Sequence, residues 1–203
     1  MKKKIVIVIL IIFMGCLLNA NFAFDIGYYC PQDADNGIIW GYDWFKVIDE
    51  RVHFGVMGNI FYRNYTATRT LTIDDDKIKA NSDLISMFLP LMLGVQINFM
   101  DTDIRPFAGG GIGWSIGKDT IFNAKYDSQA LNIHDTRFFS GFTWQINSGA
   151  KYSLGKNSEL YGKVFYAFSP LKHSADKSNT SVMRYKNLDM SGVGISIGLR
   201  MIY

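Results

Sequence analysis

From residue 21 onward, large apolar side chains alternate with small or polar ones along most of the chain. The clearest stretch is Phe138–Leu154, in which the even positions are mostly large and apolar and the odd positions are small or polar. A period of two is typical of β-strands whose faces lie in different environments. The even positions include Phe142, Trp144, Ile146 and Tyr152, and the odd ones Gly141, Thr143, Gln145 and Lys151.

The same alternation predicts eight strands, joined in turn by short and long connections. Tight turns are predicted at Asp49–Arg51, Met100–Asp103 and Gly155–Ser158, and longer polar loops at 30–37, 66–85, 118–137 and 172–189. An even strand number with short turns at one end and long loops at the other is typical of outer-membrane barrels. We therefore predict an all-β fold: a single closed, eight-stranded antiparallel transmembrane β-barrel with up-and-down meander order. The predicted strands are Asn21–Tyr29, Ile38–Ile48, Val52–Tyr65, Ser86–Phe99, Ile104–Gly117, Phe138–Leu154, Glu159–Leu171 and Met190–Tyr203.

Two soluble β-architectures also have many antiparallel strands, namely lipocalin-like barrels and immunoglobulin-like sandwiches. Both need a polar, charged exterior in water. The minor face of the last predicted strand is too small for that role, because it reads Gly192, Gly194, Ser196, Gly198 and Arg200. The larger apolar face is therefore expected to contact lipid.

The N-terminal segment resembles an export signal. Lys2–Lys4 precede an apolar run of fourteen residues, Ile5–Leu18, which is shorter than the roughly 20 residues of a membrane-spanning helix. We predict a signal peptide within residues 1–23, cleaved after Ala20 or Ala23, and a barrel domain over residues 24–203. A lipoprotein signal acylated at Cys16 is the alternative.

The chain's excess of positive charge comes from this signal. The sequence has 21 Lys and Arg against 18 Asp and Glu, and three of the cations are Lys2–Lys4. The remaining 18 cations balance the 18 acidic residues, so nucleic acid is not an expected partner.

The C-terminal strand resembles the assembly signal of bacterial outer-membrane barrels, a terminal aromatic preceded by alternating apolar residues. Ile104–Gly117, "IRPFAGGGIGWSIG", is similar to a strand of the small outer-membrane barrel superfamily that includes OmpA-like, OmpX-like, OmpW-like and opacity-type proteins. The resemblance implies residence in the cell outer membrane, contact with lipopolysaccharide-type lipid, and recognition by the barrel-assembly machinery. The signal residues are Tyr203, Met201, Leu199, Ile197 and Ile195.

Charged residues on the minor face are candidates for a network inside the barrel. An eight-stranded barrel is just wide enough to be filled by side chains, so a plugged, polar lumen is favoured over an ion path. Pairing is expected because an unpaired buried charge is costly, and Asp25 with Arg200 is one candidate pair. The predicted network is Asp25, Asp43, Arg63, Arg105, Lys151, Lys163 and Arg200.

No catalytic, metal or cofactor motif emerges from the sequence. His173 and Ser174 are adjacent and would point to opposite faces of a strand, His53 and His134 are isolated, and Gly109–Gly113 lies inside a strand. We expect a monomeric, non-enzymatic protein that acts structurally or binds a host or surface ligand through its loops. A small channel for ions or solutes is the alternative, and a lipid A-modifying enzyme is less favoured.

Overall fold

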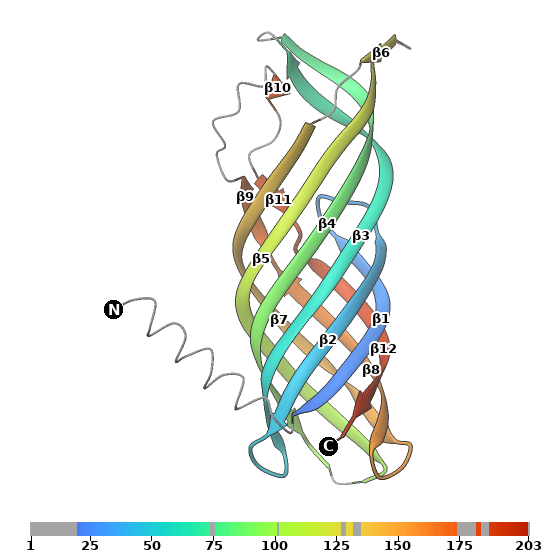
Figure 1. The fold of residues 1–203 in the computed structure, drawn as a ribbon, viewed down its shortest axis with the longest axis vertical. Coiled ribbons are helices and arrows are strands. Elements are labelled where there is room, and N and C mark those ends of the chain that lie inside the picture. Colours follow the sequence, from blue (N-terminus) through green and yellow to red (C-terminus); the bar gives the residue numbers. More distant parts are fainter. Residues whose placement is uncertain are drawn as a thin grey trace, which may run out of the picture.

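The structure is a computed structural model and describes residues 20–73, 76–100, 102–126, 129–131, 135–173, 182–183 and 187–202. Eight long antiparallel strands close into a barrel (Figure 1), in which each strand pairs with its sequence neighbours and the last pairs with the first. The predicted fold class is confirmed. The barrel strands are β1 (Asn21–Pro31), β2 (Gly37–Val47), β3 (Val52–Ile73), β4 (Asp76–Asn98), β5 (Ile104–Tyr126), β7 (Asp135–Ser153), β8 (Ser158–Phe168) and β12 (Gly192–Met201).

Four short strands lie at one end of the barrel, which we call the loop end. The opposite end, the turn end, carries the tight connections 48–51, 99–103 and 154–157. Gly155 in the last of these has a φ of +156°, which an L side chain rarely adopts. The short strands are β6 (Gln129–Leu131), β9 (Pro170–His173), β10 (Val182–Met183) and β11 (Asn187–Asp189).

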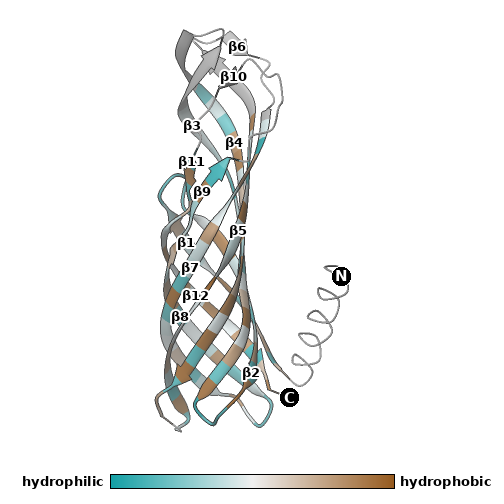
Figure 2. Cartoon of the chain, turned by 90° about the vertical axis from the view of Figure 1, so that its left-hand side faces the viewer, coloured by the Kyte–Doolittle hydropathy of each residue, from teal (hydrophilic) through white to brown (hydrophobic). Residues whose placement is uncertain are grey.

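The outer face of the barrel is an apolar belt. On β4 the outward side chains run from Met87 to Ile97, all large and exposed. Ten residue steps of a strand tilted by about 40° rise about 25 Å, which matches the apolar band of an outer-membrane barrel. Figure 2 shows hydrophobic and hydrophilic positions alternating along these strands. Within the described part of the chain, no helix has the length and apolarity to cross a bilayer.

Four strands continue beyond this belt at the loop end, where the sequence predicted long loops. Residues 66–73 continue β3, 76–85 belong to β4, 118–126 continue β5, and 135–137 belong to β7. The prediction of loops at 66–85 and 118–137 is wrong for most of these residues. Polarity suggested a loop, yet Thr66 and Thr68 of β3 are exposed and β-branched, which suits a strand with a water-exposed face.

The pairing of β1 bears on where the chain is cleaved. Phe22 pairs with Met201 of β12 and Trp44 of β2, and Ala23, which is 0% exposed, pairs with Arg200 and Asp43. Cleavage after Ala23 would remove these pairs from two neighbouring strands, although every backbone group inside a bilayer needs a partner. We expect the mature protein to begin at Asn21. Intact-mass measurement of the protein from outer membranes checks this, and a first residue of Phe24 would contradict it.

Candidate functional site

Lys163 on β8 is the centre of a charged layer in the turn half of the lumen. Its Nζ lies 2.8 Å from Asp25 Oδ2 on β1 and 3.5 Å from Asp43 Oδ2 on β2. Tyr161, two residues earlier on the same strand face, donates a 2.7 Å hydrogen bond to Asp25 Oδ2. All four side chains are buried, so one cation holds two carboxylates away from solvent.

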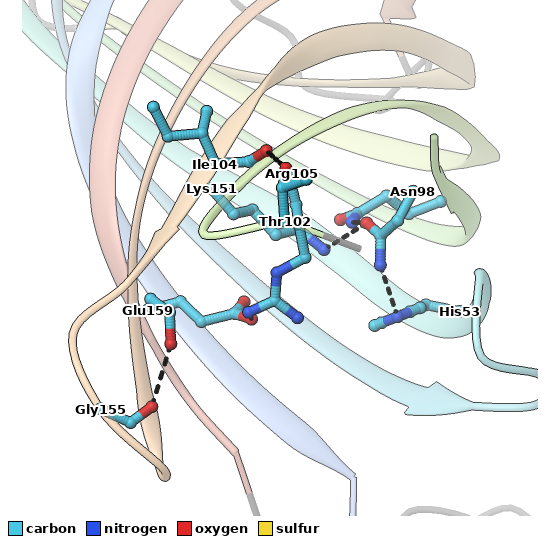
Figure 3. A network of polar contacts seen from close by, with 10 residues as sticks. His53, Asn98, Thr102, Ile104, Arg105, Lys151, Gly155 and Glu159 are labelled. Atoms are coloured by element: carbon cyan, nitrogen blue, oxygen red, sulfur yellow. Dashed lines mark hydrogen bonds and ion pairs between the residues drawn. The ribbon is translucent and has the colours of Figure 1, made fainter. Parts of the chain in front are cut away.

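A second ion pair lies closer to the turn end. The guanidinium of Arg105 on β5 is 2.5 Å from Glu159 Oε1 on β8 (Figure 3), and Arg105 is partly exposed. The alternation of the sequence places Glu159 on the lumen face, although it is not among the seven residues of the predicted network; it shares the inward face of its strand with Tyr161 and Lys163. Arg105 and Glu159 therefore form the part of the network that lies nearest to the turn end.

Lys151 on β7 contacts an amide rather than a carboxylate. Its Nζ donates to Asn98 Oδ1 at 2.8 Å and lies 5.2 Å from the centre of the Phe107 ring. Asn98 Nδ2 is in turn 3.0 Å from His53 Nε2, and Figure 3 shows these three side chains in a row. The row links β7, β4 and β3 across the turn half of the lumen.

Arg200 on β12 also contacts an amide. Its Nη2 donates to Gln96 Oε1 at 3.0 Å, and Gln96 Nε2 donates to Asn98 Oδ1 at 3.0 Å. The guanidinium carbon lies 5.6 Å and 5.9 Å from the ring centres of Tyr161 and Phe45, at cation–π distance. Two amides thus connect Arg200 with Lys151.

Most of the predicted lumen residues lie together, with two differences. The structure brings Asp25, Asp43, Arg105, Lys151, Lys163 and Arg200 into this half of the barrel, whereas Arg63 is exposed. Arg63 lies just beyond the start of β2, where Ile38 pairs with Tyr62, and lines a polar hollow with Asp35 and Asn36. Asp25 pairs with Lys163, so the expected pairing with Arg200 is wrong.

The loop half of the lumen is filled by aromatic rings, which the prediction of a polar lumen missed. Tyr29 on β1 stacks with Phe88 and with Phe165 at ring-centre distances of 6.4 and 5.7 Å, and Phe61 meets it edge-on at 5.7 Å. The Tyr29 hydroxyl donates to the Met190 carbonyl. The sequence does indicate that these rings point inward, because they share strand faces with inward polar residues. The layer comprises Tyr29, Ile39, Phe61, Phe88, Phe139, Phe165, Ala167, Leu171, Leu188 and Met190.

The segment between β8 and β12 contacts two sides of the loop end. β9 pairs with β7 through Phe139 and His173, β11 pairs with β9, and β10 pairs with β3 through Ile73 and Val182. Leu171 and Leu188 from this segment are fully buried in the aromatic layer. The described strands β9 and β11 are therefore packed into the mouth of the barrel.

Of the loop residues that the sequence analysis considered for catalysis, His173 lies in the described part of the chain. His173 Nδ1 is 2.9 Å from the Phe138 carbonyl oxygen, and its ring packs against Phe139. The candidates outside the described residues are Ser174, His134, Tyr203 and the signal segment before Ala20. Among the residues that are described, no group of three His, Cys, Asp or Glu side chains is placed to hold a metal ion.

Comparison with known proteins identifies the fold. No protein-family model and no curated protein sequence matches the chain. Its structure is similar to that of neisserial surface protein A, with a TM-score of 0.56 and 12% identity over 91% of this chain and 97% of that one. It is also similar to the outer membrane protein OprG of Pseudomonas aeruginosa, with a TM-score of 0.54 and 12% identity over 91% and 96%.

A third solved structure extends this likeness. A major outer membrane protein of Thermus thermophilus matches with a TM-score of 0.52 and 12% identity, over 91% of this chain and 99% of that one. At such identities the likeness concerns the fold. The chain therefore has the fold of small eight-stranded outer-membrane β-barrels, as its sequence suggested.

Proposed function

We propose that the chain is a closed outer-membrane anchor that presents a raised, polar surface for binding at the cell exterior. The observation that carries this proposal is the asymmetry of the barrel. Its lumen is packed with buried aromatic and charged side chains, while β3, β4, β5 and β7 continue past the apolar belt. The packed part supplies stability, and the raised strands supply a surface.

The raised surface has the polar character that a water-exposed binding region needs. On the outside of the β3–β4 hairpin, Thr66 donates to Asp83 Oδ1 at 2.7 Å and Thr68 donates to Asn81 Oδ1 at 2.6 Å. On this outer face, the pair Asn64 and Ile85 lies between the ladder and the exposed apolar pair Tyr62 and Met87. The change from apolar to polar side chains marks the level at which the hairpin leaves the lipid.

The proposal has three further parts. The protein is non-catalytic, it resides among lipopolysaccharide-type lipids as a monomer, and its C-terminal strand is recognised by the barrel-assembly machinery. The apolar residues Ile195, Ile197, Leu199 and Met201 support the last role, because all face outward on β12. A small channel is the alternative function, and the two layers inside the lumen argue against it.

Truncation of the raised hairpin tests the binding role. Replacing residues 67–82 by Asn-Gly joins Thr66 to Asp83, which already pair across the hairpin, through a two-residue turn. Cells of a non-adherent strain carrying the full barrel are expected to be retained on at least one of three surfaces: immobilised glycosaminoglycans, matrix proteins or bacterial cells. The truncated barrel should lose this retention at equal outer-membrane abundance, and equal retention of both would contradict the proposal.

Planar-bilayer recording separates the anchor from the channel. The refolded wild-type barrel is expected to give no steady conductance, because the lumen is occupied over both halves. A steady conductance that changes in Lys151→Ala or Arg200→Ala would establish the channel instead. Outward-facing Lys46→Ala is the control, since its side chain lies outside the lumen.

A further inference from the structure

The charges in the turn half of the lumen are unevenly matched. Its three carboxylates, Asp25, Asp43 and Glu159, each pair with Lys163 or Arg105 through one oxygen, and Oδ1 of Asp25 and of Asp43 is buried without a hydrogen-bond partner in the described structure. Within the described chain, the remaining cations, Lys151 and Arg200, form no ion pair with a carboxylate. The cluster therefore has four cations and three anions, and its excess positive charge lies at Lys151 and Arg200.

Both of these cations are deeply buried, each with a relative exposure of 1%. Removing an ion from water costs several kcal/mol even after the protein relaxes, and an amide oxygen returns only part of this. The amide partners are also shared, because Asn98 Oδ1 accepts from both Lys151 and Gln96. The two amides therefore solvate the cations only in part, and they supply no negative charge.

Hydrogen-bond donors near these cations remain without a partner. Nε and Nη1 of Arg200 are buried and have no acceptor in the described structure, and Nδ1 of His53 is buried without a hydrogen-bond partner. Arg200 carries only donors, so its free nitrogens call for an acceptor. A water molecule would supply the acceptor but not the missing negative charge.

We propose that the lumen binds one small inorganic anion, with chloride as the representative ligand, between Arg200 and Lys151. The surrounding rings of Phe45, Phe107 and Tyr161 occupy the same layer and favour a monatomic ion over a larger carboxylate or phosphate ester. The anion neutralises the excess charge and accepts from the free nitrogens of Arg200. It acts as a structural ion of the barrel, independently of any ligand at the raised surface.

The test is the unfolding of the detergent-refolded barrel in sodium chloride and in sodium gluconate at equal ionic strength. A ligand that binds only the folded state raises the unfolding midpoint as its concentration increases. The wild type is expected to become more stable as chloride replaces gluconate, and bromide should substitute for chloride. Arg200→Met and Lys151→Met should each lose this dependence.

The control variant is Lys46→Met, which removes a cation on the outer face at the turn end and should keep the wild-type response to chloride. It separates binding in the lumen from general salt effects on the detergent-solubilised protein. In gluconate, Arg200→Met should be at least as stable as the wild type, because an apolar group replaces an uncompensated charge.

Crystals of the wild type grown in bromide provide a second measurement that needs no variant. An anomalous peak beside the Arg200 guanidinium would support the site even if Arg200→Met or Lys151→Met failed to refold. The absence of a bromide peak would overturn the proposal. So would an identical chloride response in the wild type and Arg200→Met.

Discussion

Replacing Lys163 by methionine is expected to destabilise the refolded barrel by about 3–5 kcal/mol, the typical cost of removing one partner from a buried ion pair. The substitution leaves both Asp25 and Asp43 buried without their cation, which lies 2.8 and 3.5 Å from them. It also places a flexible apolar side chain where two carboxylates converge. Urea unfolding in detergent measures the loss.

The matched control for Lys163→Met is Ile197→Val on the neighbouring strand. Ile197 pairs with Gly162, adjacent to Lys163, but its side chain faces lipid. Its truncation should cost about 0.5–1.5 kcal/mol at most, since lipid can fill the space that the methyl group leaves. If Ile197→Val were the more damaging change, the inward and outward faces of β8 and β12 would be assigned the wrong way round.

A triple variant distinguishes electrostatics from packing in this result. Combining Lys163→Met with Asp25→Asn and Asp43→Asn removes the uncompensated carboxylates while keeping the shape of the layer. Replacing a buried ion cluster by neutral groups is often close to neutral in stability. The triple variant should therefore recover most of the stability lost in Lys163→Met, and a further loss would mean that packing around Lys163 dominates.

The alternation of the sequence was sufficient to predict the eight strands and their two faces. It could not predict which residues meet across strands, because pairing depends on register as well as on face. Asp25 and Arg200 do share the lumen face of neighbouring strands, but Asp25 pairs with Gly198 and Ala23 with Arg200. Because of this offset of two residues, Asp25 pairs with Lys163 instead of Arg200. Lys163 lies on β8, which is two strands away from β1 around the barrel.

The length of the strands was underestimated for a different reason. In a soluble protein a run such as Thr66–Ile85 would be read as a loop from its polarity, yet in a barrel a strand stays regular after it leaves the lipid. The backbone pairs of β3 and β4 continue to Ile73 and Asp76 because each strand still has its neighbour. Polarity in this chain marks the end of the lipid belt rather than the end of the strand.

The sequence did not predict the aromatic layer, because the layer forms only when inward apolar residues of several strands come together. Tyr29, Phe61 and Phe165 each follow the polar face of their own strand and look like isolated exceptions to the alternation. Only the closed barrel brings them to one level around the lumen. The position of each ring along its strand, rather than its presence, decides that the loop half is apolar.

Tyr29→Ala is expected to cost about 3–5 kcal/mol, the range for removing a large aromatic side chain from a packed core. Tyr29 is 0% exposed, and the rings of Phe88 and Phe165 both stack against it. Each aromatic pair adds about 0.5–1.5 kcal/mol beyond the buried area. The variant leaves a cavity in the lumen that lipid cannot reach, and urea unfolding in detergent measures its cost.

Two variants calibrate the effect of Tyr29→Ala. Tyr29→Phe removes only the hydroxyl that donates to the Met190 carbonyl, so it should cost about 0.5–1.5 kcal/mol. Tyr28→Ala changes the adjacent residue of β1, whose side chain is exposed on the lipid face, where detergent or lipid replaces the ring. If Tyr28→Ala and Tyr29→Ala were equally destabilising, the loop half of the lumen would be hydrated, and the closed anchor would lose its main support against the channel.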